Sequence, residues 1–322
     1  RVSRWTDRIE KNMAEIREFG GGFHIGEKDK IPTIPGVGME GEAGFNFKCF
    51  LFLPERYKEG ELTVILPGFG HRASALGDSF KRSAEFFAET SKVPTIIPLE
   101  DWQPNHKDLN RRYTYWTLAG FGRRIAVAKC IDLLDNKTAD ERRQKLKQLM
   151  GVQGDIPGLN IERINFIGYS YHGPTAVELG ADYLPKTRAV ICVAPINNRY
   201  ELRESADEKK LPIVSGEPEY AFLFGNRGLP LIDPLAIPSE GEKRDEKQSL
   251  QENAKLLKVA GIPIRILYGS GDPVMPIERS RDFTRLIESE MTVVYPIEAI
   301  GARIHDFSDE VMMKTIADAL LI

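Results

Sequence analysis

The sequence has little of what marks several classes of protein. It contains 3 cysteines in 322 residues, and no pair of them has metal-ligand spacing. No apolar run approaches the ~20 residues that a membrane span needs. Basic and acidic residues number 44 and 47, and the resulting net charge of −3 gives no electrostatic footprint for nucleic acid. We therefore expect no nucleic-acid partner and no integral membrane segment.

The cysteines also bear on the compartment. Cys49, Cys130 and Cys192 lie in strand-like or helix-like contexts, so we expect buried free thiols rather than disulfides. Such thiols favour a cytoplasmic protein. The sequence begins at Arg1 rather than at methionine, so a removed tag, a truncated segment or a signal peptide all stay open, and secretion with them. A homo-oligomer also stays open.

Apolar strand-like runs alternate with helix-like patterns along most of the chain. Strands are expected at residues 45–54, 62–67, 95–99, 164–167, 188–195, 263–268 and 292–296. Helices are expected at residues 73–92, 113–135, 138–150 and 248–259, from about 174, and from about 307. This alternation predicts an α/β protein with a doubly wound, mostly parallel sheet covered on both faces. In such sheets ligands bind beyond the carboxyl ends of the strands.

Two segments depart from that alternation. Residues 1–44 are predicted to be an N-terminal extension, helical to about residue 20 and loop-like afterwards, and residues 45–322 the main domain. The helix is expected because Trp5, Ile9, Met13, Ile16 and Phe19 recur at roughly helical spacing.

Within the main domain, residues from about 200 to 247 are predicted to form an inserted lid. The lid combines charged stretches with an apolar tract that contains Tyr220, Phe222 and Phe224. Packing on the main domain explains part of this tract, and an apolar roof over the active site explains the rest. The three aromatic residues are therefore candidate substrate contacts.

The most informative stretch runs from Arg163 to Leu179, RINFIGYSYHGPTAVEL. A short buried strand leads to Gly168 and Ser170, and a helix is predicted soon afterwards. A serine on a sharp strand-to-helix turn is how a nucleophile elbow exposes a hydroxyl at the end of a sheet. The usual pattern is G-x-S-x-G, whereas His172 occupies the second glycine position and Gly173 follows one step late. Alone, the stretch fits an elbow or an ordinary turn that contains a serine.

Three further features fall at predicted strand ends. Asp272 follows one late strand, His305 lies after the last strand and before the last helix, and glycines occur in Leu66–His71 after an early strand. Each has a structural alternative: a turn residue, a helix-start histidine, and glycines that end a strand. Their order along the chain is Ser…Asp…His, and His305 is the one histidine of five that follows Asp272.

In these motifs the sequence resembles the α/β-hydrolase superfamily, from about residue 45 to the C-terminus. The resemblance implies an α/β-hydrolase fold with Ser170 as nucleophile, His305 as general base and acid, and Asp272 as the carboxylate that orients the imidazole. It also implies an oxyanion hole formed by the amides of Tyr171 and Phe69.

Some details of the resemblance stay open. Gly70 is the alternative to Phe69 as a donor, and His71 either touches substrate or faces solvent. His172 departs from the family pattern, and so does Pro67, where many relatives have histidine. These departures leave the subfamily open and do not touch the three catalytic candidates.

The implied activity is that of a serine hydrolase acting on a small-molecule carboxylic ester with an apolar acyl or alcohol part, through an acyl-enzyme intermediate. No cofactor or metal is expected, since the chain has no H-E-x-x-H motif and its GFG lacks the residues of a phosphate loop. A thioesterase, lactonase or small-amide hydrolase would use the same machinery. A ligand-binding protein that keeps the fold with little turnover is the alternative of another class.

Overall fold

The computed structural model describes residues 14–25, 43–68, 78–102, 112–152, 156–196, 240–269, 277–289, 291–295 and 310–321. The strands are β1 (Glu15–Ile25), β2 (Ala43–Leu53), β3 (Gly60–Leu66), β4 (Thr95–Trp102), β5 (Ile161–Tyr169), β6 (Thr187–Val193), β7 (Ile264–Gly269) and β8 (Met291–Tyr295). The helices are α2 (Asp78–Ser91), α3 (Arg112–Leu134), α4 (Asp140–Met150), α5 (Gly173–Asp182), α8 (Glu240–Val259), α9 (Ile277–Leu286) and α10 (Glu310–Leu321), and a short 3₁₀ turn, η3, spans Ser170–His172.

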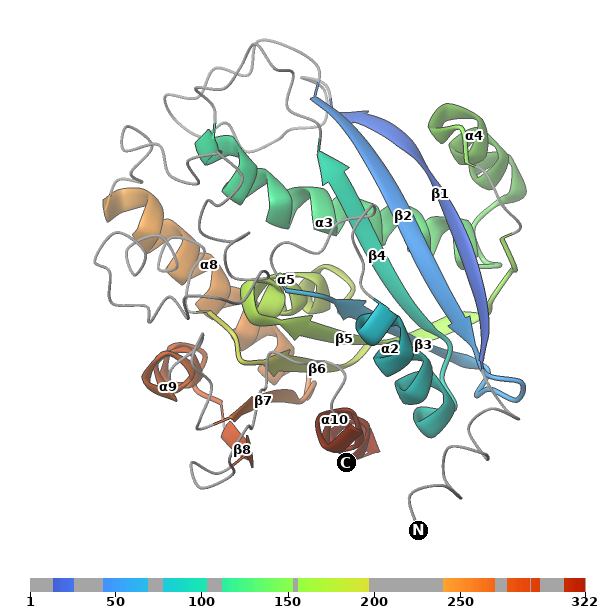
Figure 1. Cartoon of the computed structure of the whole chain (residues 1–322). Coiled ribbons are helices and arrows are strands. Elements are labelled where there is room, and N and C mark those ends of the chain that lie inside the picture. Colours follow the sequence, from blue (N-terminus) through green and yellow to red (C-terminus); the bar gives the residue numbers. More distant parts are fainter. Residues whose placement is uncertain are drawn as a thin grey trace.

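The strands form one sheet in the order β1-β2-β4-β3-β5-β6-β7-β8. β2 is antiparallel to both β1 and β4, and every pairing from β4 to β8 is parallel. The predicted mostly parallel sheet is therefore confirmed. The parallel strands start at one edge and end at the other, so the chain leaves β3, β5, β6 and β7 on the same side (Figure 1).

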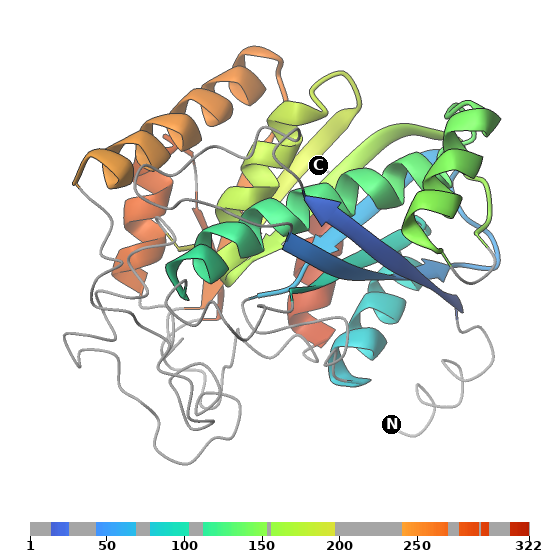
Figure 2. The same cartoon turned by 90° about the horizontal axis from the view of Figure 1, so that it is seen from above.

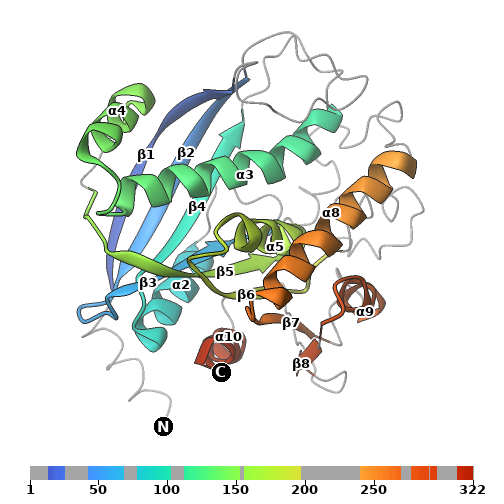
Figure 3. The same ribbon diagram turned by 180° about the vertical axis from the view of Figure 1, so that it is seen from behind.

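Helices cover both faces of this sheet. α2 and α10 lie in front of the sheet in Figure 1, whereas α3, α5 and α8 lie in front of it in the reverse view of Figure 3. The view from above in Figure 2 shows the strands between these two groups. A strand buried on both faces needs apolar residues at consecutive positions, which explains the continuous apolar runs in the sequence.

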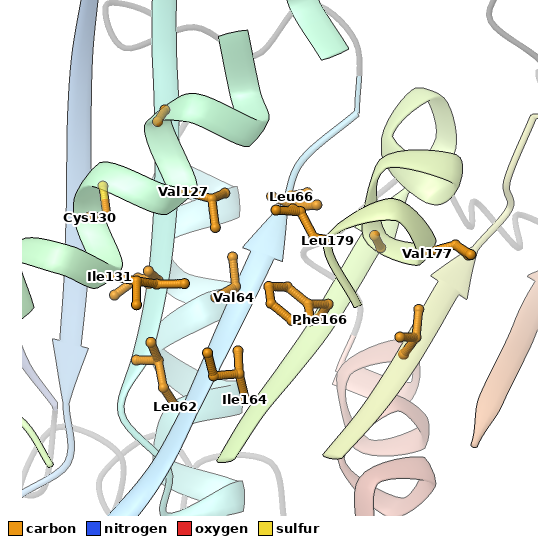
Figure 4. Packing of buried hydrophobic residues seen from close by; sticks show 14 of the residues in the cluster. Leu62, Val64, Leu66, Val127, Cys130, Ile131, Ile164, Phe166, Val177 and Leu179 are labelled. Carbon is orange, nitrogen blue, oxygen red and sulfur yellow. The ribbon is translucent and has the colours of Figure 1, made fainter. Parts of the chain in front are cut away.

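Side chains that alternate along the strands supply the two cores. Val64 of β3 and Phe166 of β5 pack with Val127 of α3 and Val177 of α5 (Figure 4). The next residues along the two strands, Ile65 and Ile167, point to the opposite face and join a core that includes Phe87 of α2 and Ile316 of α10. Successive strand residues thus fix the sheet between two helical layers.

The predicted N-terminal helix is wrong for residues 15–20. They belong to β1, which runs through the three glycines at residues 20–22 and pairs with β2 along its whole length. Ile16 and Phe19 are three residues apart, a spacing that would put them on one face of a helix but puts them on opposite faces of a strand. Residues 1–13 lie outside the described residues, and the division of the chain at residue 44 stays a prediction.

Two other differences concern helices. α9 has no counterpart among the expected elements, because its sequence is mostly polar and Phe283 is its one fully buried large apolar side chain. α8 begins at Glu240 rather than near residue 248, so residues 240–247 of the predicted lid are helical. Residues 200–239, the rest of that lid, lie outside the described residues.

One expectation from composition is confirmed. Cys49, Cys130 and Cys192 are free and buried. Among the helices of the described ranges, none combines the length and hydropathy needed to cross a membrane.

The position of β1 yields a first prediction. Phe19 lies in register with Cys49 and is 2% exposed, whereas Ile16 is 41% exposed. Phe19→Ala should therefore lower the free energy of unfolding by about 3–5 kcal/mol, and Ile16→Ala by about 1 kcal/mol or less. Urea unfolding of both variants measures the difference. Equal losses would mean that both side chains face the core, as a helix would arrange them.

Candidate active site

Ser170 occupies a strained turn between β5 and α5. Tyr169 is still extended, with φ −109° and ψ 131°, and Ser170 then adopts a left-handed φ of 51°. η3 leads directly into α5. A left-handed backbone is costly for a residue other than glycine, so such residues persist only where their surroundings hold them. This is the strand–turn–helix geometry that the nucleophile-elbow interpretation predicts.

A glycine at position 168 allows that turn. A Cβ atom placed on Gly168 would overlap the carbonyl oxygen of His172 and would lie 2.7 Å from the Cβ of Ala176. The end of β5 therefore lies directly against the backbone of η3 and the first turn of α5. Any side chain at position 168 would push the helix away from the strand and open the turn that holds Ser170.

The departure from the usual pattern at His172 is accommodated by the next residue. Gly173 makes the close approach, because a Cβ there would lie 2.5 Å from the Cβ of Pro195 beyond β6. His172 itself is 1% exposed. Its Nδ1 lies 3.3 Å from Oγ1 of Thr175, and its ring meets that of Tyr171 edge-on at 5.0 Å. The His172 side chain is thus packed inside the protein, against Thr175 and Tyr171.

The chain that leaves β3 passes beside the serine. Leu66 pairs with Gly168, so Gly68 reaches the level of Ser170. A Cβ on Gly68 would lie 3.4 Å from the Cβ of Ser170 and 3.2 Å from a ring carbon of Tyr169. Phe69 and Gly70, the expected oxyanion donors, and His71 follow directly, but these three residues lie outside the described residues.

The other candidates follow strands whose ends lie at the same edge. β7 pairs with β6 through Val193 and Leu267, and its last residue, Gly269, precedes Asp272 by three positions. His305 lies in the segment between β8 and α10. Both residues are outside the described ranges, and their approach to Ser170 stays a prediction. The same holds for the substrate contacts Tyr220, Phe222 and Phe224.

Among the described residues, a cysteine thiol lies near the elbow. Cys192 of β6 is fully buried, and burial raises the pKa of its thiol far above the ordinary value, so it stays a neutral thiol. Its Sγ donates to the carbonyl oxygen of Gly173 at 3.5 Å. Within the described ranges, no group of three or more His, Cys, Asp or Glu residues could hold a metal ion.

No protein-family model matches the sequence, and no curated protein matches it. Several solved structures are similar in fold. Est1E from Butyrivibrio proteoclasticus is 15% identical over 93% of this chain and 96% of that chain, with a TM-score of 0.46. Carboxyl esterase 2 from the mycorrhizal fungus Tuber melanosporum is 15% identical over 85% of this chain and 80% of that chain, with a TM-score of 0.49. The Pyrococcus furiosus esterase Pf2001 is 11% identical over 86% and 87%, with a TM-score of 0.48.

Likenesses at these identities and TM-scores carry no inference about activity. The chain's own geometry is what defines its fold: a mostly parallel sheet between two helical layers, with a left-handed serine between β5 and α5. The chain has an α/β-hydrolase fold. Sequence reasoning missed two features of its elbow, the close approach of Gly173 and the turn after β6. The proline that follows the apolar run of β6 was a signal for that turn.

The close approach at Gly168 yields a second prediction. Gly168→Ala should lower the free energy of unfolding by about 3 kcal/mol or more, at the upper end of the cost of overpacking, because the new methyl group meets backbone as well as a side chain. Gly261→Ala is the control, since a Cβ there meets nothing within 4 Å and only its φ of 72° opposes the change. Urea midpoints measure both. A Gly168→Ala midpoint equal to that of wild type would contradict the contact between β5 and α5.

Proposed function

We propose that this protein is a serine hydrolase that cleaves a carboxylic ester through an acyl-enzyme intermediate, with Ser170 as the nucleophile. The observation that carries the proposal is the left-handed φ of 51° at Ser170, a non-glycine residue between β5 and α5. Strain of this kind is concentrated at functional sites, where the surrounding structure over-determines it. An ordinary strand-to-helix turn does not require a left-handed backbone at a serine.

The proposed mechanism assigns each step to a residue of the chain. His305 takes the proton from the Ser170 hydroxyl as Oγ attacks the ester carbonyl, and later returns a proton to the leaving alcohol. Asp272 fixes the tautomer of the imidazole and stabilises the imidazolium. Water then attacks the acyl-enzyme with His305 as base, which releases the acid and restores the serine.

Oxyanion stabilisation in this proposal comes from two backbone amides. Tyr171 supplies one, since it directly follows the nucleophile, and Phe69 supplies the other, with Gly70 as the alternative. The contact of Gly68 with Ser170 supports this pairing, because it brings the segment after β3 to the serine. Loss of one such donor typically lowers kcat by a factor of about 10²–10³.

The substrate class in the proposal is an ester with an apolar acyl or alcohol part. Its basis is the apolar tract of the predicted lid, with Tyr220, Phe222 and Phe224 as the aromatic members. An apolar roof would discriminate between acyl chains by about 1–3 kcal/mol for each methylene-sized change. Thioesters, lactones and small amides would pass through the same intermediate, and a panel of p-nitrophenyl, thioester and amide substrates ranks them.

The third prediction tests the nucleophile. A fluorophosphonate probe should label Ser170, found by mass spectrometry of the labelled peptide, and Ser170→Ala should abolish both labelling and ester hydrolysis with an unchanged unfolding midpoint. The change removes one oxygen atom and keeps the Cβ, so the fold should survive it although Ser170 is buried. Retention of more than a few per cent of the hydrolysis would reject the assignment. Absence of labelling in the wild type would favour the ligand-binding alternative.

The fourth prediction separates two histidines. His305→Ala should lower kcat/KM by about 10⁴ or more, comparable to the loss of the serine, because the two act as a unit. His172→Ala should keep kcat/KM within about tenfold of wild type, since the predicted base is another residue. It should lower stability by about 1–2 kcal/mol through lost packing. Both variants are compared on one ester at pH 7–8, and the reverse ranking would make His172 the base.

A further inference from the structure

A second strained residue lies next to the elbow. Four non-glycine residues of the described ranges have a left-handed φ: Lys92, Ser170, Ala194 and Glu288. Lys92 and Glu288 follow the ends of α2 and α9, where a left-handed residue commonly ends a helix. Ala194 has a φ of 45° directly after β6, is fully buried, and has no helix to end. The end of a helix therefore does not explain the left-handed φ of Ala194.

Ala194 and Ser170 lie side by side. β5 and β6 are neighbours in the sheet (Figure 1). They are parallel and Tyr169 pairs with Val193, so the residues that follow each strand are adjacent. Both strands leave the sheet through a left-handed residue. The Ala194 N–H donates to the carbonyl oxygen of Leu267 on β7 at 2.7 Å, which ties the turn after β6 to the sheet.

The same turn is tied to the elbow. The Ile196 N–H donates to the carbonyl oxygen of Ser170 at 3.3 Å, and Pro195 packs against Gly173. The carbonyl oxygen of Ser170 also accepts a hydrogen bond from the Gly173 N–H. Two amides from two different segments thus hold one carbonyl group, that of the proposed nucleophile.

Holding this carbonyl group also fixes the next amide. The carbonyl of Ser170 and the N–H of Tyr171 belong to one planar peptide unit, and in a trans peptide they point in opposite directions. The hydrogen bonds from Ile196 and Gly173 hold the Ser170 oxygen on the side of the turn where these two amides lie. The Tyr171 N–H therefore points to the opposite side. In the proposed function this N–H is an oxyanion donor, and such donors act by being oriented before the reaction.

We infer that the turn Ala194–Ile196 is a positioning element of the active site, in which the Ile196 N–H orients the Tyr171 amide as an oxyanion donor by holding the Ser170 carbonyl. This inference rests on the proposed function and adds a residue that contacts no substrate atom. This role explains the left-handed φ of Ala194. The bend at Ala194 directs the chain from the end of β6 toward Ser170, where the Ile196 N–H meets the Ser170 carbonyl.

The test removes one N–H and no side chain. Ile196 is replaced by its α-hydroxy acid analogue in the full-length protein, so that an ester oxygen stands where the N–H was. The matched control is the same replacement at Val190, in the middle of β6. The Val190 N–H donates to the carbonyl oxygen of Pro263 at 3.0 Å. Both proteins are titrated with a fluorophosphonate probe, and kcat and KM for a p-nitrophenyl ester are expressed per labelled Ser170.

The Ile196 ester should lower kcat by roughly tenfold, less than the loss of a whole donor, with KM changed by less than about twofold, since the oxyanion forms only in the transition state. The Val190 ester should leave kcat per labelled serine unchanged. An unchanged kcat for the Ile196 ester, or equal losses for both esters, would overturn the inference while labelling of Ser170 keeps the proposed function. Absence of labelling in the wild type would overturn the proposed function itself.

A second pair of variants covers the case in which the Ile196 ester does not fold. Ala194→Gly keeps the left-handed turn accessible but loosens it, and Ala189→Gly makes the same change in the body of β6, where glycine weakens a strand. Ala194→Gly should reduce kcat per labelled serine several-fold and lower the unfolding midpoint less than Ala189→Gly. A loss of kcat that followed the loss of stability across the two variants would assign the turn a structural role alone.

Discussion

The left-handed backbone of Ser170 is the constraint on which the rest of this structure depends. An L-residue does not stay in that conformation unless its neighbours exclude the alternatives. Here the exclusion comes from three sides: α5 meets β5 at Gly168, the turn after β6 meets α5 at Gly173, and the segment after β3 meets the serine at Gly68. At Gly168 and Gly173 a Cβ would meet backbone atoms, which rearrangement of a side chain cannot relieve, whereas at Gly68 it would meet the side chains of Tyr169 and Ser170.

The sheet makes these close approaches possible. β3, β5 and β6 are parallel neighbours, so they end at one edge, and the two helical layers bury them on both faces. Packed interiors deform little, because their side chains already fill the space. The rigidity of the strands is thereby passed to the short segments that follow them. A serine with a left-handed backbone at a loop tip, without packed strands beside it, would relax to an ordinary turn.

How much was predictable from sequence differs between the elements. The parallel strands were found because burial on both faces requires consecutive apolar residues, as in the run around Phe166. β1 was mistaken for a helix because Ile16 and Phe19 satisfy helical spacing, and nothing local reveals that the three glycines continue a strand that β2 holds in place. α9 was missed because a helix that buries little beyond Phe283 has almost no apolar periodicity.

The elbow shows why the site was harder to predict than the sheet. The position of Ser170 followed from a strand and a helix that flank it, both of which are local signals. The sequence showed that histidine replaces glycine at position 172, but the contact that Gly173 makes instead depends on Pro195, which lies more than twenty residues further along the chain.

Because the 3₁₀ turn η3 begins at Ser170 and α5 follows it, the residue that meets the chain just beyond β6, at Pro195, is Gly173. The glycine is therefore displaced by one position in the sequence, while its close approach to the neighbouring strand is kept. A motif written as fixed spacing records one solution to this packing problem, and this chain carries another. The requirement that both share is a backbone approach to the strand beside the serine, so the feature to seek in a variant elbow is that contact rather than the spacing.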